Sequence, residues 1–174
     1  MSEYSESYHI KGGTLEDSVN LIKASSVSGY AGKFNDEWSV LVPECEGYGG
    51  DIDKKIVKHN SGVLLYFSCA EDFGMMFKLF DGKKQISVYA LDYSSDEPRV
   101  FTEGLNSSEF VKLTGIDLSA DEFEAFLCPN DFDECSFLAD NFMELIGIDP
   151  KAFSWVSYDY CQSLEPEYGF IEVI

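Results

Sequence analysis

The chain has 174 residues, 45% of them hydrophobic and 15% aromatic, which supplies one substantial core and is short for two independent domains. Only 12 Lys and Arg stand against 32 Asp and Glu, and the resulting net charge of −20 disfavours nucleic acid and anionic membranes as partners. We therefore expect a single domain over residues 1–174 whose partner is a basic protein.

The beginning of the chain and its cysteines bear on where the protein works. The first residues, MSEYSESYHI, lack the apolar core of a secretory signal, and no later run reaches transmembrane length. The five cysteines are odd in number and contain no C-x-x-C pair, which favours reduced thiols. These features predict a cytoplasmic location without membrane contact.

The first third of the chain predicts a strand, a helix and a hairpin. Residues 4–10 alternate loosely, as in a strand. Thr14 and Asp17 are spaced as a capping pair, and apolar residues then recur at helical spacing. Strands at 30–34 and 38–42 are expected to flank a turn. The Gly-rich region that follows matches no phosphate-binding spacing and predicts one turn of helix at 53–58.

The middle of the chain predicts a meander of three antiparallel strands at 63–69, 75–80 and 86–91. The first run is almost unbroken apolar, as expected for a central strand covered on both faces. Asp81-Gly82 predicts a type I′ hairpin turn. The polar segment 92–104 contains Pro98, and we expect the sheet to end there.

The last third predicts helices. Three pairs spaced as helix caps predict starts near residues 107, 120 and 132: Asn106 with Glu109, Ser119 with Glu122, and Asp131 with Glu134. Gly147 predicts the end of the last helix. Short strands are expected at 153–160 and 169–174. The whole pattern favours an α+β fold with a largely antiparallel sheet, an N-terminal helix and a C-terminal helical segment.

No residue pattern in the chain indicates catalysis or a bound metal. His9 and His59 belong to no nucleophile motif. Cys128 and Cys135 are close but lack a histidine, and the calcium-like run that starts at Asp92 has Glu97 where glycine is needed. We predict a non-catalytic protein without cofactor or metal.

The acidic residues are concentrated in one part of the chain. Residues 92–149 hold 15 acidic and two basic residues, a net charge of −13. At 100° per residue, the last helix turns its acids outward, and its predicted core face consists of Cys135, Leu138, Ala139, Phe142, Leu145 and Ile146. The helix before it is predicted to turn its acids outward and to turn inward Phe123, Phe126 and Leu127. Charged outer faces are normal for amphipathic helices, so these acids either form a solvated face or, together with the outward Phe137, a contact surface. The candidate partner-binding residues are Asp121, Glu122, Glu124, Asp133, Phe137, Asp140 and Glu144.

One resemblance makes this hypothesis more concrete. The stretch WSVLVPE, followed by GVLLYFSCAEDFGMMFKLFDG, resembles small bacterial cytoplasmic proteins, including immunity proteins that neutralise toxins. The resemblance implies a stoichiometric binder that blocks a basic toxin, such as a nuclease. Two alternatives remain: a small-molecule-binding domain or enzyme with a pocket lined by Tyr66, Tyr89 and Tyr93, and an adaptor subunit of a larger assembly.

Overall fold

The computed structural model describes residues 4–44, 50–70, 73–95, 97–130, 132–148, 161 and 169–174. The strands found there are β1 (Tyr4–Lys11), β2 (Gly29–Lys33), β3 (Trp38–Pro43), β4 (Val63–Ala70), β5 (Gly74–Asp81), β6 (Lys84–Asp92), β7 (Arg99–Phe101) and β8 (Ile171–Val173). The helices are α1 (Leu15–Ser25), α2 (Gly50–His59), α3 (Ser107–Thr114), α4 (Ala120–Phe126) and α5 (Phe132–Leu145).

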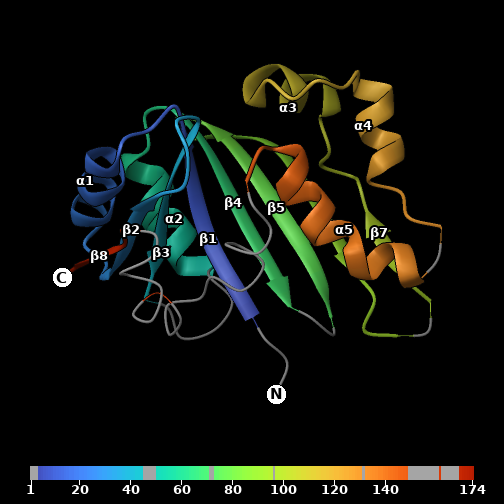
Figure 1. Cartoon of the computed structure of the whole chain (residues 1–174), viewed down its shortest axis with the longest axis horizontal. Coiled ribbons are helices and arrows are strands. Elements are labelled where there is room, and N and C mark those ends of the chain that lie inside the picture. Colours follow the sequence, from blue (N-terminus) through green and yellow to red (C-terminus); the bar gives the residue numbers. More distant parts are fainter. Residues whose placement is uncertain are drawn as a thin grey trace.

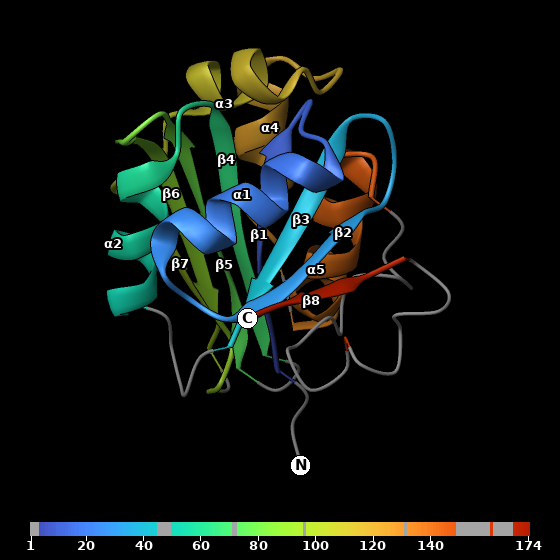
Figure 2. The same ribbon diagram turned by 90° about the vertical axis from the view of Figure 1, so that its left-hand side faces the viewer.

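All the strands join one antiparallel sheet, in the order β7-β6-β5-β4-β1-β3-β2-β8 (Figure 1). Helices cover both of its faces: α1 and α2 lie on one side, and α3, α4 and α5 lie on the other (Figure 2). Leu21 and Ile56 belong to the core under α1 and α2. Phe110, Phe123 and Phe142 belong to the core on the opposite face. The predicted α+β fold is confirmed.

The meander β4-β5-β6 is also confirmed. β4 lies between β1 and β5, and every β4 residue after Val63 is buried. The turn type is different from the predicted one. Asp81 pairs with Lys84, so Gly82 and Lys83 form the turn, and φ is positive at Gly82 (56°) but not at Lys83. This is the pattern of a type II′ turn, whose first central position prefers glycine.

The segment 92–104, where the sheet was expected to end, contributes one more strand at the sheet edge before the helices begin. β7 pairs with β6, from Asp92 with Arg99 to Ala90 with Phe101. Pro98 directly precedes β7, and a proline is tolerated there because an edge strand leaves part of its backbone unpaired. The segment therefore adds a short edge strand, which becomes one wall of the groove described below.

The structure also bears on the predicted helix at 53–58 and on the strands predicted near the end of the chain. α2 is longer than the single turn predicted at 53–58. The strand predicted within 169–174 is confirmed as β8, which pairs with β2 at the far edge of the sheet. The strand predicted at 153–160 lies outside the described residues. None of the described helices is long and apolar enough to cross a membrane.

The helix starts follow their capping residues. At α1, Asp17 N donates to Thr14 Oγ1 (3.2 Å) while Thr14 N donates to the Asp17 carboxylate (2.8 Å). Ser119 and Glu122 form the same reciprocal pair at α4. The starts predicted near 107, 120 and 132 are confirmed, and after α5 Gly147 adopts a positive φ of 83°.

Candidate functional site

One side of α5 packs on the sheet, and the candidate binding surface lies on the opposite side of this helix. Its buried residues are Cys135, Leu138, Ala139, Phe142 and Met143, followed by Ile146 just beyond its end. This confirms the predicted core face except for Leu145, which is half-buried. The opposite side of α5 is left for contact with other molecules.

Most of the predicted binding residues are exposed to solvent. Phe137 is 62% exposed, an unusual position for a phenylalanine on a packed helix. The other exposed candidates are Asp121, Glu122, Glu124, Asp133 and Glu144, whereas Asp140 is half-buried. Glu122 already has a structural role, because Ser119 donates to its carboxylate through its backbone N (2.8 Å) and Oγ (2.7 Å). These hydrogen bonds also lower the pKa of Glu122.

A hollow of about 520 Å³ lies between the end of α4 and α5. It brings Asp133 and Phe137 together with Phe126, Glu134 and the exposed Cys128. It does not include the other predicted residues, which continue the acidic surface along the two helices. The hollow thus combines exposed aromatic area with carboxylates in one concave site.

One lining residue of this hollow differs from the sequence prediction. Phe126 was expected to point inward with Phe123, but it is only half-buried. The predicted capping pair of Glu134 with Asp131 falls on a residue outside the described part of the chain. The Glu134 carboxylate accepts hydrogen bonds from Asn130 N (2.7 Å) and Nδ2 (3.0 Å). Sequence spacing assigns Phe126 and Glu134 to their helices, but it does not show that they border a hollow.

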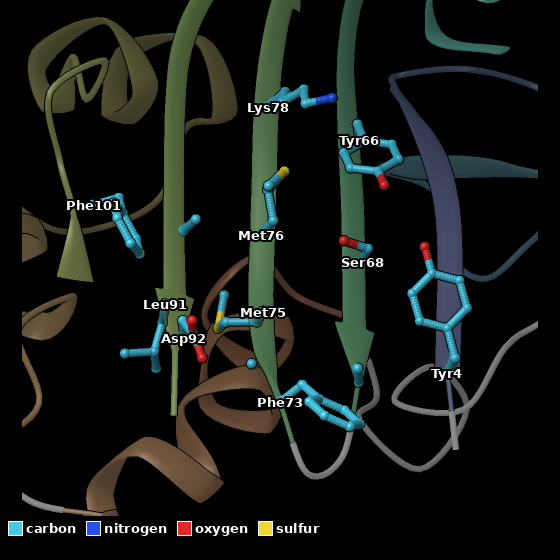
Figure 3. Close-up of a pocket in the computed structure, with 13 residues that line it drawn as sticks. Tyr4, Tyr66, Ser68, Phe73, Met75, Met76, Lys78, Leu91, Asp92 and Phe101 are labelled. Atoms are coloured by element: carbon cyan, nitrogen blue, oxygen red, sulfur yellow. The ribbon is translucent and has the colours of Figure 1, made fainter. Parts of the chain in front are cut away.

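A second concavity lies on the face of the sheet that carries α1 and α2. It is a groove of about 480 Å³ over β4, β5 and β6, bounded by β1 and β7 (Figure 3). Tyr4 and Tyr66 stand on one side of it and Phe101 on the other, with Phe73 at one end. Its lining is mainly aromatic and aliphatic, which is typical of small-molecule sites.

The three tyrosines proposed from the sequence do not line one pocket. Tyr66 pairs with Lys78, which pairs with Val88, so Tyr66 shares a face with Val88 and not with its neighbour Tyr89. Tyr89 is buried on the α5 side, where its hydroxyl donates to Leu127 O (2.8 Å). Tyr66 alone of the three lines the groove.

Charged groups adjoin the groove where α2 meets the sheet. Asp53 accepts hydrogen bonds from Tyr8 Oη and Lys78 Nζ. Lys78 Nζ also lies 4.7 Å from the centre of the Tyr66 ring, a cation–π distance. Nearby, Tyr4 Oη donates to the buried carboxylate of Glu6 (3.1 Å).

Both groove tyrosines keep their protons. Burial is the main cause that raises the pKa of Tyr4 and of Tyr66 far above the ordinary value, and the negative charge of Glu6 adds to it. Their hydroxyls therefore remain neutral hydrogen-bonding groups at physiological pH.

The two histidines lie in different surroundings, one buried and one exposed. His9 Nε2 lies 2.8 Å from Ser7 Oγ, but both side chains are buried, so no substrate can reach the pair. Burial lowers the pKa of His9 to about 3, and its ring is neutral. His59 is exposed on α2. In the described part of the chain, no three His, Cys, Asp or Glu side chains are grouped to hold a metal.

Comparisons with protein families, with curated proteins and with solved structures find no match for this chain. The functional proposal therefore rests on the two surfaces just described.

Proposed function

We propose that the protein is a non-catalytic acidic binding domain that holds a basic protein partner on the outer surface of α4 and α5. The observation that carries this proposal is the hollow in which the exposed Phe137 lies beside Asp133 and Glu134. Aromatic residues are enriched in protein interfaces, where a polar rim surrounds the apolar centre. The most concrete form is an immunity protein for a basic, nuclease-type toxin.

Charge and shape have separate roles in this proposal. The net charge of −13 in residues 92–149 attracts a basic surface at long range and speeds association. Phe137 and Phe126 then supply apolar area that the partner desolvates, which slows dissociation. On a nuclease, the acidic side chains would occupy the positive surface that otherwise holds phosphates.

The test measures the association rate and the dissociation rate separately. The protein captures its partner from a lysate of the source organism, and binding rates are recorded at two salt concentrations. The triple variant Asp133→Asn, Asp140→Asn, Glu144→Gln is expected to associate about tenfold more slowly at low salt and to depend less on salt. Phe137→Ala is expected to dissociate about tenfold faster or more.

A charge-matched control separates local from overall charge. Glu16, Asp81 and Glu172 are exposed on other elements, and their neutralisation as Gln, Asn and Gln removes the same charge. This control should slow association much less than the first triple variant. Equal rates for wild type, the α5 triple variant and Phe137→Ala would refute the surface assignment. If the partner is a nuclease, stoichiometric wild-type protein should also block its cleavage of DNA.

A further inference from the structure

The groove on the opposite face of the sheet is built into the fold by small residues in register. Ala70 pairs with Gly74, and Ser68 pairs with Met76, which pairs with Ala90. Short residues therefore lie on each of three adjacent strands, with the longer Met76 between Ser68 and Ala90. Aromatic rings stand around this part of the sheet (Figure 3).

Gly74 allows the backbones of β5 and β6 to approach closely at one end of the groove. A Cβ at this position would lie 1.9 Å from the backbone oxygen of Leu91, and φ is +149°. Only glycine fits such a close approach of two strands. The depression is thus a feature of the backbone as well as of side-chain size.

The walls are aromatic rings left partly open to solvent. Phe73 is 51% exposed and Phe101 is 53% exposed, and both face the groove in which Tyr66 and Met76 lie. The volume of about 480 Å³ falls within the range of small-molecule sites, roughly 300–1,000 Å³. The described helices α1 and α2 cover the adjoining part of this face and leave the groove itself open.

The charged residues around the groove determine whether it binds a cation or an anion. Lys78 is the single cation among the described lining residues, and Asp53 neutralises it. Asp92 also lines the groove, opposite Arg99 on β7, and Glu6 is buried next to Tyr4. Among these described residues the carboxylates outnumber the cations, and the rings of Phe73 and Phe101 are exposed. The groove therefore complements a cation better than an anion.

We propose that this groove binds a small amphipathic amine, whose apolar or aromatic body lies on the floor between Tyr66 and Phe101. Its ammonium group faces the Tyr4 hydroxyl or the Asp92 carboxylate, because Lys78 Nζ already lies over the Tyr66 ring. This site is separate from the α4 and α5 surface, because it lies on the other side of the sheet and uses none of the same residues.

The test uses three probes with the same phenylbutyl body: 4-phenylbutylamine, 4-phenylbutanol and 5-phenylpentanoate. The readout is the NMR signal of ¹³C-labelled methionine methyl groups. Met76 lines the groove, whereas Met143 is buried in the core on the opposite face and serves as an internal control. The amine should shift the Met76 signal saturably and bind about tenfold more tightly than the carboxylate, with the alcohol between them.

Matched variants test the location. Phe101→Ala and Phe137→Ala each remove one exposed phenylalanine, from the groove and from the α5 surface respectively. Phe101→Ala should weaken amine binding about three- to tenfold, because an aromatic wall is lost, and Phe137→Ala should not change it. Ala90→Leu should also weaken binding, because it fills the floor.

Three results would overturn the proposal: no saturable Met76 shift with any probe, a carboxylate that binds as tightly as the amine, or equal weakening by Phe101→Ala and Phe137→Ala. None of these results bears on the binding of a protein partner, so the two proposals fail separately.

Discussion

Phe142 shows how single residues hold α5 on the sheet. Its ring stacks on Phe77 with centroids 4.9 Å apart and on Phe67 at 5.8 Å, both nearly parallel. Phe110 adds a tilted contact with Phe77 at 4.9 Å. All four rings are buried, so α3, α5 and two central strands share one aromatic cluster.

Replacement of Phe142 by alanine should lower the free energy of unfolding by about 3–5 kcal/mol, because it leaves a cavity in this cluster. Denaturant unfolding followed by circular dichroism measures the change. Phe137→Ala, on the exposed side of the same helix, is the control and should cost much less. An unchanged midpoint for Phe142→Ala would contradict the packing of α5.

His9 makes stability depend on pH. Burial lowers its pKa from 6.5 to about 3, so below pH 6.5 the unfolded chain binds a proton that the folded chain does not. The stability that the neutral His9 ring contributes to the folded state is fully present above pH 6.5 and is lost as the pH falls towards 3. Between pH 7 and pH 5 the free energy of unfolding should fall by about 2 kcal/mol.

Denaturant unfolding at several pH values, with wild type and His9→Gln, tests this dependence. The variant should show a flatter profile between pH 7 and pH 5, whatever its overall stability. His59→Gln removes the exposed histidine and keeps His9, so it should retain the wild-type slope. A slope that survives the loss of His9 would assign the effect to other groups.

At the scale of elements, the turn between β2 and β3 anchors the end of α5. Asn35 Nδ2 donates to Gly147 O (2.7 Å), and Trp38 Nε1 donates to Ile146 O (2.9 Å). The other side of the Asn35 amide accepts from Glu37 N and Trp38 N, both at 2.9 Å. One side chain thus shapes the turn and satisfies a carbonyl that follows the helix.

Asn35→Ala should cost about 1–3 kcal/mol, because it removes these hydrogen bonds from a half-buried position. Asn35→Asp keeps the acceptor for the turn but loses the donor to Gly147 and places a negative charge near the helix end. Hydrogen exchange should therefore increase in the last turn of α5 for both variants. Asn20→Ala on the exposed side of α1 is the control, and equal exchange in all three would contradict the anchor.

At the scale of the whole molecule, the sheet separates the two proposed sites. The hollow belongs to α4 and α5, and the groove belongs to the face under α1 and α2 (Figures 1 and 2). The sheet between them is packed with buried side chains on both faces. The two ligands should therefore bind without competition.

Titration of the amine probe into free protein and into the complex with the captured partner measures this independence. The two affinities should agree within about twofold, since distant sites usually couple by less than about 0.5 kcal/mol. The Met76 signal reports the groove in both states. Displacement of one ligand by the other would show that the sites overlap or are coupled through the sheet.

The sequence alone determined the elements whose signals are local. The capping pair of Thr14 and Asp17, the alternation in β6 and the helical spacing in α5 depend on residues close in the chain. The outward position of Asp133 and Phe137 follows from the same helical spacing. Local backbone geometry repeats with a fixed period, so these features could be read before any tertiary contact was known.

Only the tertiary structure decided which residues meet. Phe126 borders a hollow because α4 ends beside α5, and the joining of β7 to the sheet edge places Phe101 opposite Tyr66. The groove depends on the register that aligns Ser68 with Ala90 across β5, and a shift of one residue would turn each side chain of a strand to the other face. Register and helix docking are set by the packing of the whole core, because no local pattern specifies which strands and helices become neighbours.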